Sequence, residues 1–148
     1  MLFRNRTVLL SRRHKTGWED GKYGMVAGHV ESGESVLDAM IREAKEEAGI
    51  DVAKKDLRLV HVMHRKLPAA SDFLDLFFTA DQWQGEPANM EQDKCDDLRW
   101  FPLDALPGNT LAYIRAAIMH HLDGSACSEW GWKEDVATHG LPRAHRPL

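Results

Sequence analysis

The chain has 148 residues, of which 43% are hydrophobic and 28% are charged, and its formal net charge is −4. This length and composition predict one soluble globular domain, and the acidic balance argues against a general nucleic-acid or membrane binder. The cysteines, Cys95 and Cys127, lack the spacing of a zinc site or a disulfide framework, and the sequence reads as having no signal peptide or membrane span, so we expect a cytoplasmic location.

The first part of the chain favours short strands. Residues 1–3 and 7–12 read as strands joined by a polar turn, and residues 22–27 read as a third strand after a glycine-containing loop. This third strand leads into a stretch that is rich in glutamate and glycine. We therefore expect a small sheet before the first helix.

A helix is predicted at residues 36–48. Its apolar residues recur at helical spacing and form one stripe for a core, namely Leu37, Met40, Ile41, Ala44 and Ala48. Ser35 is placed to cap the start of the helix, and Gly49 suits the left-handed residue that commonly follows a helix.

The second half of the chain alternates strand and loop patterns before a second helix. Strands are predicted at residues 57–66, 71–80 and 98–101, loops at residues 67–71 and 83–97, and the helix at residues 110–122. From Asp123 onward the composition shifts to Gly, Pro, His and Trp. We predict a single domain at residues 1–133, onto which Trp130 and Trp132 pack, and a disordered tail at residues 134–148.

Three glutamates of the first predicted helix indicate a metal site. Glu43, Glu46 and Glu47 are related as i, i+3 and i+4, so they project from one face of a helix. Like charges at this spacing repel each other by roughly 0.2–0.5 kcal/mol per pair, and a divalent cation removes that cost. Hard oxygen ligands suit Mg²⁺, with Mn²⁺ as an alternative, rather than zinc.

The segment from Gly28 to Ile50, GHVESGESVLDAMIREAKEEAGI, resembles the Nudix box, the signature of Nudix hydrolases. In that signature a Gly, a Glu and the run Arg-Glu-aliphatic-any-Glu-Glu-any-Gly-aliphatic occur at fixed spacing. The matching residues are Gly28, Glu34, Arg42, Glu43, Ala44, Glu46, Glu47, Gly49 and Ile50. Ala44 is smaller than the usual aliphatic residue. The alternative, a plain acidic helix face, leaves both glycines and the loop acids unexplained.

The resemblance implies an α/β fold, namely the Nudix α/β/α sandwich with a mixed β-sheet. It also implies cleavage of a pyrophosphate linkage in a nucleotide derivative, with Mg²⁺ as the cofactor. By resemblance, Glu46 and Glu47 are metal ligands, and Glu43 is either a ligand or the group that orients the attacking water. Backbone carbonyls of Ala27 and Gly28 would complete the metal shell.

Arg42 lies one helical turn before Glu46 in the predicted helix. We expect it to hold the orientation of the carboxylates, so that Glu43, Arg42 and Glu46 form the predicted catalytic group. The alternative for Arg42 is a plain surface ion pair.

Residues 83–91, WQGEPANME, resemble the loop of MutT-like nucleoside triphosphate pyrophosphohydrolases, Trp-x-Gly-Glu-Pro followed by a more distant Glu. In those enzymes the distant Glu is a further metal ligand, and its position here is Glu91. Glu86 is the rival for this role. A solvated loop acid is the alternative for Glu91.

Three further residues are candidates for substrate binding. Asn109 ends a Leu-Pro-Gly-Asn turn similar to the turn whose Asn reads guanine in MutT-like enzymes, because an amide can bind a purine edge with two hydrogen bonds. The alternative, which we favour, is that Asn109 caps the helix predicted from Thr110. Arg12 and Arg13 either contact substrate phosphates or protect the edge of a sheet.

The sequence shows none of the downstream motifs that mark the NADH, coenzyme A or ADP-ribose subfamilies of Nudix enzymes. The leading prediction is therefore a MutT-like nucleoside triphosphate pyrophosphohydrolase that releases a nucleoside monophosphate and pyrophosphate. Alternatives are a pyrophosphatase acting on ADP-ribose, nucleotide sugars or dinucleoside polyphosphates, and an inactive nucleotide-sensing module, against which the intact box argues. The expected partner is a small nucleotide rather than a nucleic-acid polymer, and the expected state is a monomer or homodimer.

Overall fold

The structure is a computed structural model that describes residues 1–67 and 72–132. Residues 68–71 of the predicted loop, and the tail predicted at residues 134–148, lie outside the described residues. The elements are β1 (Phe3–Arg4), β2 (Thr7–Arg13), β3 (Tyr23–Gly24), α1 (Val36–Ala48), the short 3-10 turn η1 (Lys54–Asp56), β4 (Leu57–Arg65), β5 (Phe73–Ala80), β6 (Cys95–Pro102), α2 (Ala112–Asp123) and β7 (Cys127–Trp130).

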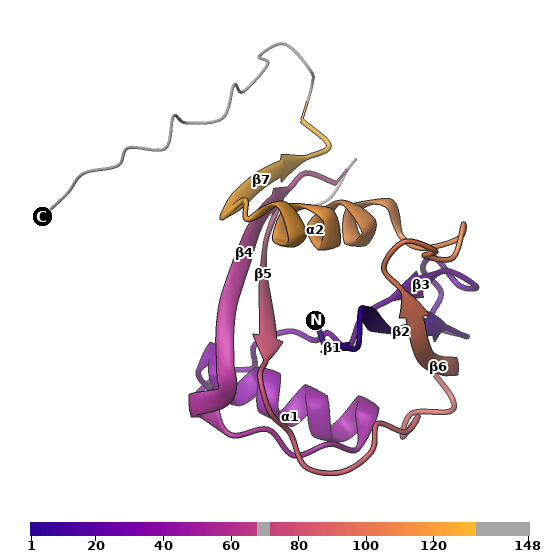
Figure 1. The fold of residues 1–148 in the computed structure, drawn as a ribbon, viewed down its shortest axis with the longest axis vertical. Coiled ribbons are helices and arrows are strands. Elements are labelled where there is room, and N and C mark those ends of the chain that lie inside the picture. Colours follow the sequence, from indigo (N-terminus) through magenta and orange to yellow (C-terminus); the bar gives the residue numbers. More distant parts are fainter. Residues whose placement is uncertain (68–71, 133–148) are drawn as a thin grey trace, which may run out of the picture.

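The strands form two sheets. In the first sheet, β2 pairs antiparallel with β1, β3 and β6. In the second sheet, β4 pairs antiparallel with β5 and parallel with β7, so this sheet is mixed. Figure 1 shows α1 on one side of the two sheets and α2 on the other. The predicted α/β class, with helices on both sides of the strands, is confirmed.

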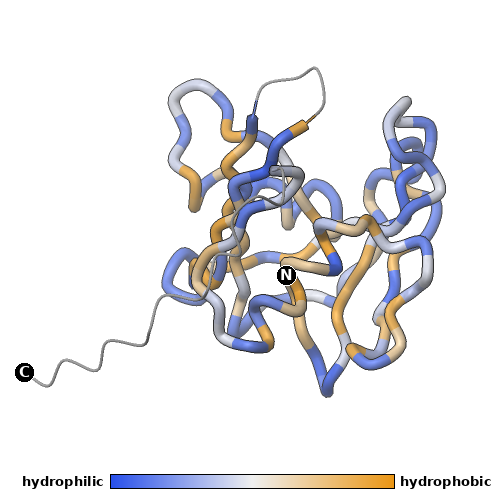
Figure 2. The backbone as a smooth tube through the Cα atoms, turned by 90° about the horizontal axis from the view of Figure 1, so that it is seen from above, coloured by the Kyte–Doolittle hydropathy of each residue, from blue (hydrophilic) through white to orange (hydrophobic). Residues whose placement is uncertain are grey.

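Strand β2 contributes to two apolar clusters because its side chains alternate between its faces. Val8 and Leu10 belong to the cluster that includes Ile114 and Ile118 of α2. Leu9, between them in sequence, packs in the cluster that includes Ala44 and Ala48 of α1, Ile50 and Val52. In Figure 2 the hydrophobic first residues of the chain lie near the middle of the molecule. The strand that carries Arg12 and Arg13 is therefore anchored from both sides.

Helix α1 has the predicted bounds. The hydroxyl of Ser35 accepts a hydrogen bond from the backbone N–H of Asp38 at 3.2 Å. Gly49 has φ of 70°, a left-handed conformation that costs glycine little. The buried residues of α1 are Ala39, Ala44 and Ala48, whereas the larger residues of the predicted stripe are only partly buried. Small side chains at the contact allow α1 to lie close to the sheet.

The predicted bounds of three strands were wrong, and the first strand, expected at residues 1–3, is β1 at Phe3–Arg4. β3 is limited to Tyr23–Gly24, because only these two residues pair with β2 before the chain turns away toward the box. β6 begins at Cys95 rather than at residue 98. Its acidic start, which reads as a loop, pairs with the arginines of β2, and Arg12 Nε donates to Asp96 Oδ1 at 2.7 Å. Opposite charges across the two strands stabilise this pairing, although aspartate on its own has a low preference for strands.

The expected capping role of Asn109 was also wrong. Helix α2 begins at Ala112, and its N-cap is Leu111, which makes no side-chain capping bond. Asn109 Nδ2 instead donates to the carbonyl of Gly21 at 2.6 Å. The side chain thus ties the turn before α2 to the loop between β2 and β3.

Strand β7 was missed in the sequence patterns, although the packing of Trp130 and Trp132 was expected. Trp130 lies in β7 and packs against the core, and Trp132 Nε1 donates to the carbonyl of His64 at 3.1 Å. His61, which is 1% exposed, links β4 to this segment. Its Nδ1 lies 2.8 Å from the carbonyl oxygen of Ser125, and its Nε2 lies 2.8 Å from Ser128 Oγ.

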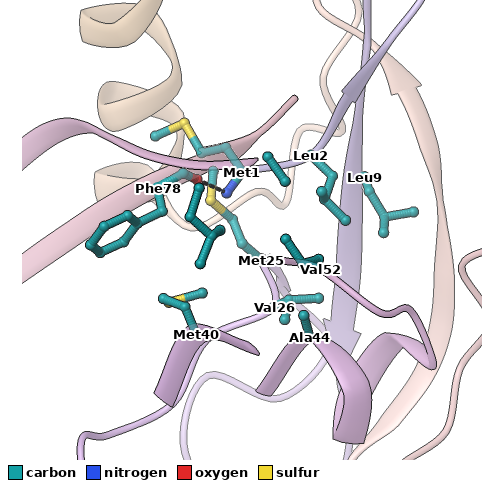
Figure 3. Close-up of a pocket in the computed structure, with 11 residues that line it drawn as sticks. Met1, Leu2, Leu9, Met25, Val26, Met40, Ala44, Val52 and Phe78 are labelled. Atoms are coloured by element: carbon teal, nitrogen blue, oxygen red, sulfur yellow. Dashed lines mark hydrogen bonds between the residues drawn. The ribbon is translucent and has the colours of Figure 1, made fainter. Parts of the chain in front are cut away.

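A small apolar cavity of about 30 Å³ remains beneath α1. Figure 3 shows Met40 and Ala44 on one side of it and Leu9 and Phe78 among the residues that close it. Since the lining is almost wholly apolar, the cavity is a packing void that β2 and α1 leave between them. Within residues 1–67 and 72–132, no helix has the length and apolar character needed to cross a membrane.

We predict that His61→Phe destabilises the protein by about 1–3 kcal/mol, because the Ser125 carbonyl and the Ser128 hydroxyl lose a buried partner. Ser128→Ala removes one of the two bonds and should cost about 0.5–1.5 kcal/mol. Urea denaturation followed by tryptophan fluorescence measures both changes. An unfolding free energy for His61→Phe equal to that of the unchanged protein would show that β7 is held by other contacts.

Candidate active site

A cleft of about 500 Å³ opens beside the box, a size suited to a nucleotide-sized ligand. It is lined by the end of β2, the end of β3, the box, the segment before β6, part of β6 and the start of α2. The charged side chains that line it are Arg12, Arg13, Glu31, Arg42, Glu43, Glu46, Glu47, Glu91 and Lys94. The fold therefore brings the box acids and Glu91, which are far apart in sequence, into one cleft.

Arg42 joins the box loop to helix α1. Its Nε and Nη2 donate to the two carboxylate oxygens of Glu34 at 3.2 and 2.8 Å. Its Nη1 donates to Glu43 at 2.7 Å and to Glu46 at 3.1 Å, and its Nη2 also donates to the carbonyl of His29 at 3.2 Å. The guanidinium beside Glu34 holds the pKa of that carboxyl below its usual value. Arg42 thus offsets the repulsion between carboxylates from two segments.

Glu43 lies directly against the backbone of Gly28. A Cβ atom added to Gly28 would lie 1.7 Å from Glu43 Oε1, far inside van der Waals contact. The side chain of Glu43 is only 12% exposed. The first glycine of the box is therefore required for close approach of a carboxylate rather than for an unusual backbone conformation.

Glu47 points toward the start of the box. The backbone N–H of Ala27 donates to its Oε2 at 3.3 Å. Burial, followed by the negative charge of Glu43, raises the pKa of Glu47 to about 8 in the metal-free protein, and the charge of Glu91 acts in the same direction. A carboxylate in such surroundings is stabilised when a cation binds beside it.

The two rival acids of the following loop lie in different places. Glu91 lines the cleft, where its Oε1 accepts from Lys94 Nζ at 2.8 Å. Glu86 lies outside the cleft lining and pairs with Arg4 at 2.8 and 3.1 Å. The arrangement is compatible with a role in metal binding for Glu91 but not for Glu86.

Of the predicted substrate-binding residues, Arg12 and Arg13 line the cleft and Asn109 does not. Arg13 Nε donates to the carbonyl of Trp18 at 2.7 Å, and its guanidinium lies 4.8 Å from the centre of the Trp18 ring. Both arginines sit where β2 pairs with β3 and β6, so they are not at an open edge of the described sheet.

Within residues 1–67 and 72–132, no three His, Cys, Asp or Glu side chains converge on a single point ready to hold a metal. Three of the cleft acids are instead engaged in ion pairs, Glu43 and Glu46 with Arg42 and Glu91 with Lys94. The donor set still fits a hard divalent cation, since its carboxylates line one cleft and Gly28 leaves room for one of them.

The sequence patterns did not single out two residues of the cleft. Lys94 follows Glu91 by three residues, a spacing that could have suggested the ion pair they form. Tyr113 gives no such signal, because it enters the lining through the placement of α2. The guanidinium of Arg65 lies 4.2 Å from the centre of the Tyr113 ring and forms a partly buried pair with Asp75.

Comparison with known proteins gives consistent results. A family model described as the NUDIX domain matches residues 1–122. Over 123 residues the chain is 36% identical to an NAD-capped RNA hydrolase NudC of Pseudomonas aeruginosa. The aligned region covers 83% of this chain but 41% of that protein. The chain thus spans about two fifths of the length of the first curated relatives that it matches.

Two further proteins resemble the chain over most of their own length. The oxidized purine nucleoside triphosphate hydrolase of Danio rerio is 29% identical over 137 residues, which cover 78% of this chain and 86% of that protein. The crystal structure of a MutT NUDIX hydrolase from Burkholderia pseudomallei superposes with a TM-score of 0.72 and 32% identity, covering 80% of this chain and 90% of that one.

We predict that Gly28→Ala lowers metal-dependent hydrolysis by at least about tenfold, equivalent to about 1.4 kcal/mol, while the melting temperature changes little. The added methyl group must displace the flexible carboxylate of Glu43 but need not distort the backbone. Gly108→Ala is the matched control, since a Cβ there meets no atom within 4 Å. Unchanged hydrolysis by Gly28→Ala would mean that the observed position of Glu43 is not the active one.

The pKa of Glu47 predicts how the stability of the metal-free protein varies with pH. Because the folded-state pKa is about 8 and the ordinary pKa of a glutamate carboxyl is 4.5, the folded state holds this proton more tightly. The contribution to stability is complete below pH 4.5 and is lost as the pH rises through 8. Relative to Glu47→Gln, the unchanged protein should therefore lose unfolding free energy between these pH values, as measured by urea denaturation in EDTA. A difference that is constant with pH would contradict the raised pKa.

Proposed function

The chain belongs to the Nudix hydrolase family, and from this premise we propose that it is a metal-dependent, MutT-like nucleoside triphosphate pyrophosphohydrolase. The substrate would be cleaved at a phosphoric anhydride bond by water, giving a nucleoside monophosphate and pyrophosphate. The observation that carries this proposal is the shared cleft of the box glutamates and Glu91, which faces Arg12 and Arg13 on β2.

We assign the metal to Glu46, Glu47 and Glu91, with Glu43 either as a further ligand or as the residue that orients the attacking water. Backbone carbonyls of Ala27 and Gly28 are the additional ligands in this proposal. When bound, Mg²⁺ or Mn²⁺ would screen the phosphate charge and polarise the P–O bond that breaks.

The protein's own groups prepare the cleft for this chemistry. Arg42 keeps Glu43 and Glu46 in place through hydrogen bonds of 2.7 and 3.1 Å, which limits the reorganisation needed before reaction. Gly28 leaves Glu43 room against the backbone. Arg12 and Arg13 supply positive charge on the facing strand, where they would attract the phosphate groups of a substrate.

The choice of a nucleoside triphosphate rests on two considerations. The loop at residues 83–91 is similar to that of MutT-like enzymes, and a solved MutT NUDIX hydrolase is 32% identical to this chain. The relative from Danio rerio is named for oxidized purine nucleoside triphosphates, which supports a purine substrate of that kind. Asn109 remains a candidate for base recognition only if the nucleotide reaches beyond the lining of the cleft.

Cleavage of NAD-capped RNA is the second candidate. It is favoured by the 36% identity to a NudC protein, and it breaks the same type of bond. We rank cleavage of NAD-capped RNA second because the chain shows none of the downstream motifs of the NADH subfamily. ADP-ribose, nucleotide sugars and dinucleoside polyphosphates follow. We further propose a cytoplasmic protein that acts on a small nucleotide as a monomer or homodimer.

A substrate panel with Mg²⁺ tests the proposal. It should contain standard and oxidised nucleoside triphosphates, ADP-ribose, a nucleotide sugar, a dinucleoside polyphosphate, NADH and an NAD-capped RNA, with products separated by chromatography. We expect monophosphate and pyrophosphate from a nucleoside triphosphate, and no turnover by Glu47→Gln, although its melting temperature should not fall below that of the unchanged protein. Preferential cleavage of the capped RNA would favour the second candidate, and no cleavage of any compound would refute both.

Substitutions in the loop at residues 83–91 test whether Glu91 is a metal ligand. We predict that Glu91→Gln lowers kcat or weakens Mg²⁺ activation by at least about tenfold, about 1.4 kcal/mol, because it removes a charge from the cleft. Glu86→Gln is the control, since this residue pairs with Arg4 away from the cleft. A silent Glu91→Gln beside a damaged Glu86→Gln would transfer the role to Glu86.

A further inference from the structure

The charged group of Lys94 has fewer contacts than the charged groups of the other cationic residues in the cleft. The cations that line the cleft are Arg12, Arg13, Arg42 and Lys94. Each arginine has more than one contact that fixes its guanidinium, either hydrogen bonds or an aromatic ring. The ammonium of Lys94 has one ion pair, with Glu91 at 2.8 Å, and its side chain is 59% exposed.

The backbone of Lys94, in contrast, is firmly held. Its N–H donates to the carbonyl of Glu91 at 3.0 Å, and its own carbonyl accepts from the N–H of His14 at 2.8 Å. Asn89 braces the same turn, because its Oδ1 accepts from the N–H of Glu91 at 3.1 Å and its Nδ2 donates to the carbonyl of Cys95 at 2.6 Å. The side chain of Lys94 can therefore move while its backbone stays at the wall of the cleft.

A metal ion and the Lys94 ammonium would compete for one carboxylate. Glu91 is the partner of Lys94 in the metal-free protein and a metal ligand in the function proposed above. A divalent cation bound to Glu91 repels the ammonium, since both are positive. The displaced ammonium stays within reach of the cleft, because the backbone of Lys94 is fixed at the cleft wall, and an anionic group beside the metal would offer it a new partner.

We propose that Lys94 is a phosphate-binding residue, which pairs with Glu91 in the metal-free protein and with the polyphosphate of the substrate once metal is bound. This inference rests on the proposed function only through the role of Glu91. It makes two claims: Lys94 opposes binding of the metal alone, and it favours binding of a metal–polyphosphate complex.

Isothermal titration calorimetry with Mn²⁺ alone, and with inorganic tripolyphosphate in saturating Mg²⁺, tests both claims without a nucleoside. Lys94→Met should bind tripolyphosphate about tenfold more weakly, the loss expected of one charge-assisted hydrogen bond, and should bind Mn²⁺ at least as tightly as the unchanged protein. Lys94→Arg, which keeps the charge, should recover most of the tripolyphosphate affinity. Lys22→Met is the matched control, because Lys22 also forms an i, i+3 ion pair, with Glu19, outside the cleft lining.

The outcomes separate this inference from the proposed function. Tripolyphosphate affinity of Lys94→Met within about twofold of the unchanged protein would overturn it, as would weaker Mn²⁺ binding by that variant or no measurable tripolyphosphate binding by the unchanged protein. A failure of the unchanged protein to hydrolyse any nucleotide refutes the proposed function, but it leaves the two affinity comparisons for Lys94 valid. Melting temperatures of all variants confirm that each is folded.

Discussion

The structure of the cleft depends on how the mutual repulsion of its carboxylates is balanced. Arg42 provides this balance at one end, where a single guanidinium bonds to Glu34, Glu43 and Glu46 and to the carbonyl of His29. Since these groups come from the loop and from α1, the same bonds that neutralise charge also fix the loop on the helix. In this arrangement Glu43 lies in close contact with Gly28.

In the cleft, cationic side chains therefore lie beside the acids and form ion pairs with them. Arg42 serves the acids of the helix, and Lys94 serves Glu91. Burial, followed by the negative charge of Glu43, raises the pKa of Glu47. A divalent cation would relieve the remaining repulsion, so in the proposed function metal binding would be coupled to a rearrangement of charged side chains.

Features set by neighbouring residues could be predicted, and features set by distant partners could not. The bounds of α1 follow from Ser35, the helical spacing and Gly49, which act within a few residues. The start of β6 depends on the pairing of Asp96 with Arg12, and the side chain of Asn109 bonds to Gly21 rather than to α2. The box glutamates were recognisable from their spacing, whereas the cleft position of Tyr113 depends on the packing of α2.

The parallel pairing of β7 with β4 has a consequence for the order of folding. Val62 pairs with Cys127, so this contact joins residues far apart in the chain, whereas β4 and β5 are neighbours in sequence. During synthesis the β4–β5 ladder can form before Cys127 leaves the ribosome, and the ring of His61 meets its serine partners only afterwards. Because closing long-range contacts is slow, docking of β7 is expected to be a late event, and nascent chains would expose the edge of β4 until it occurs.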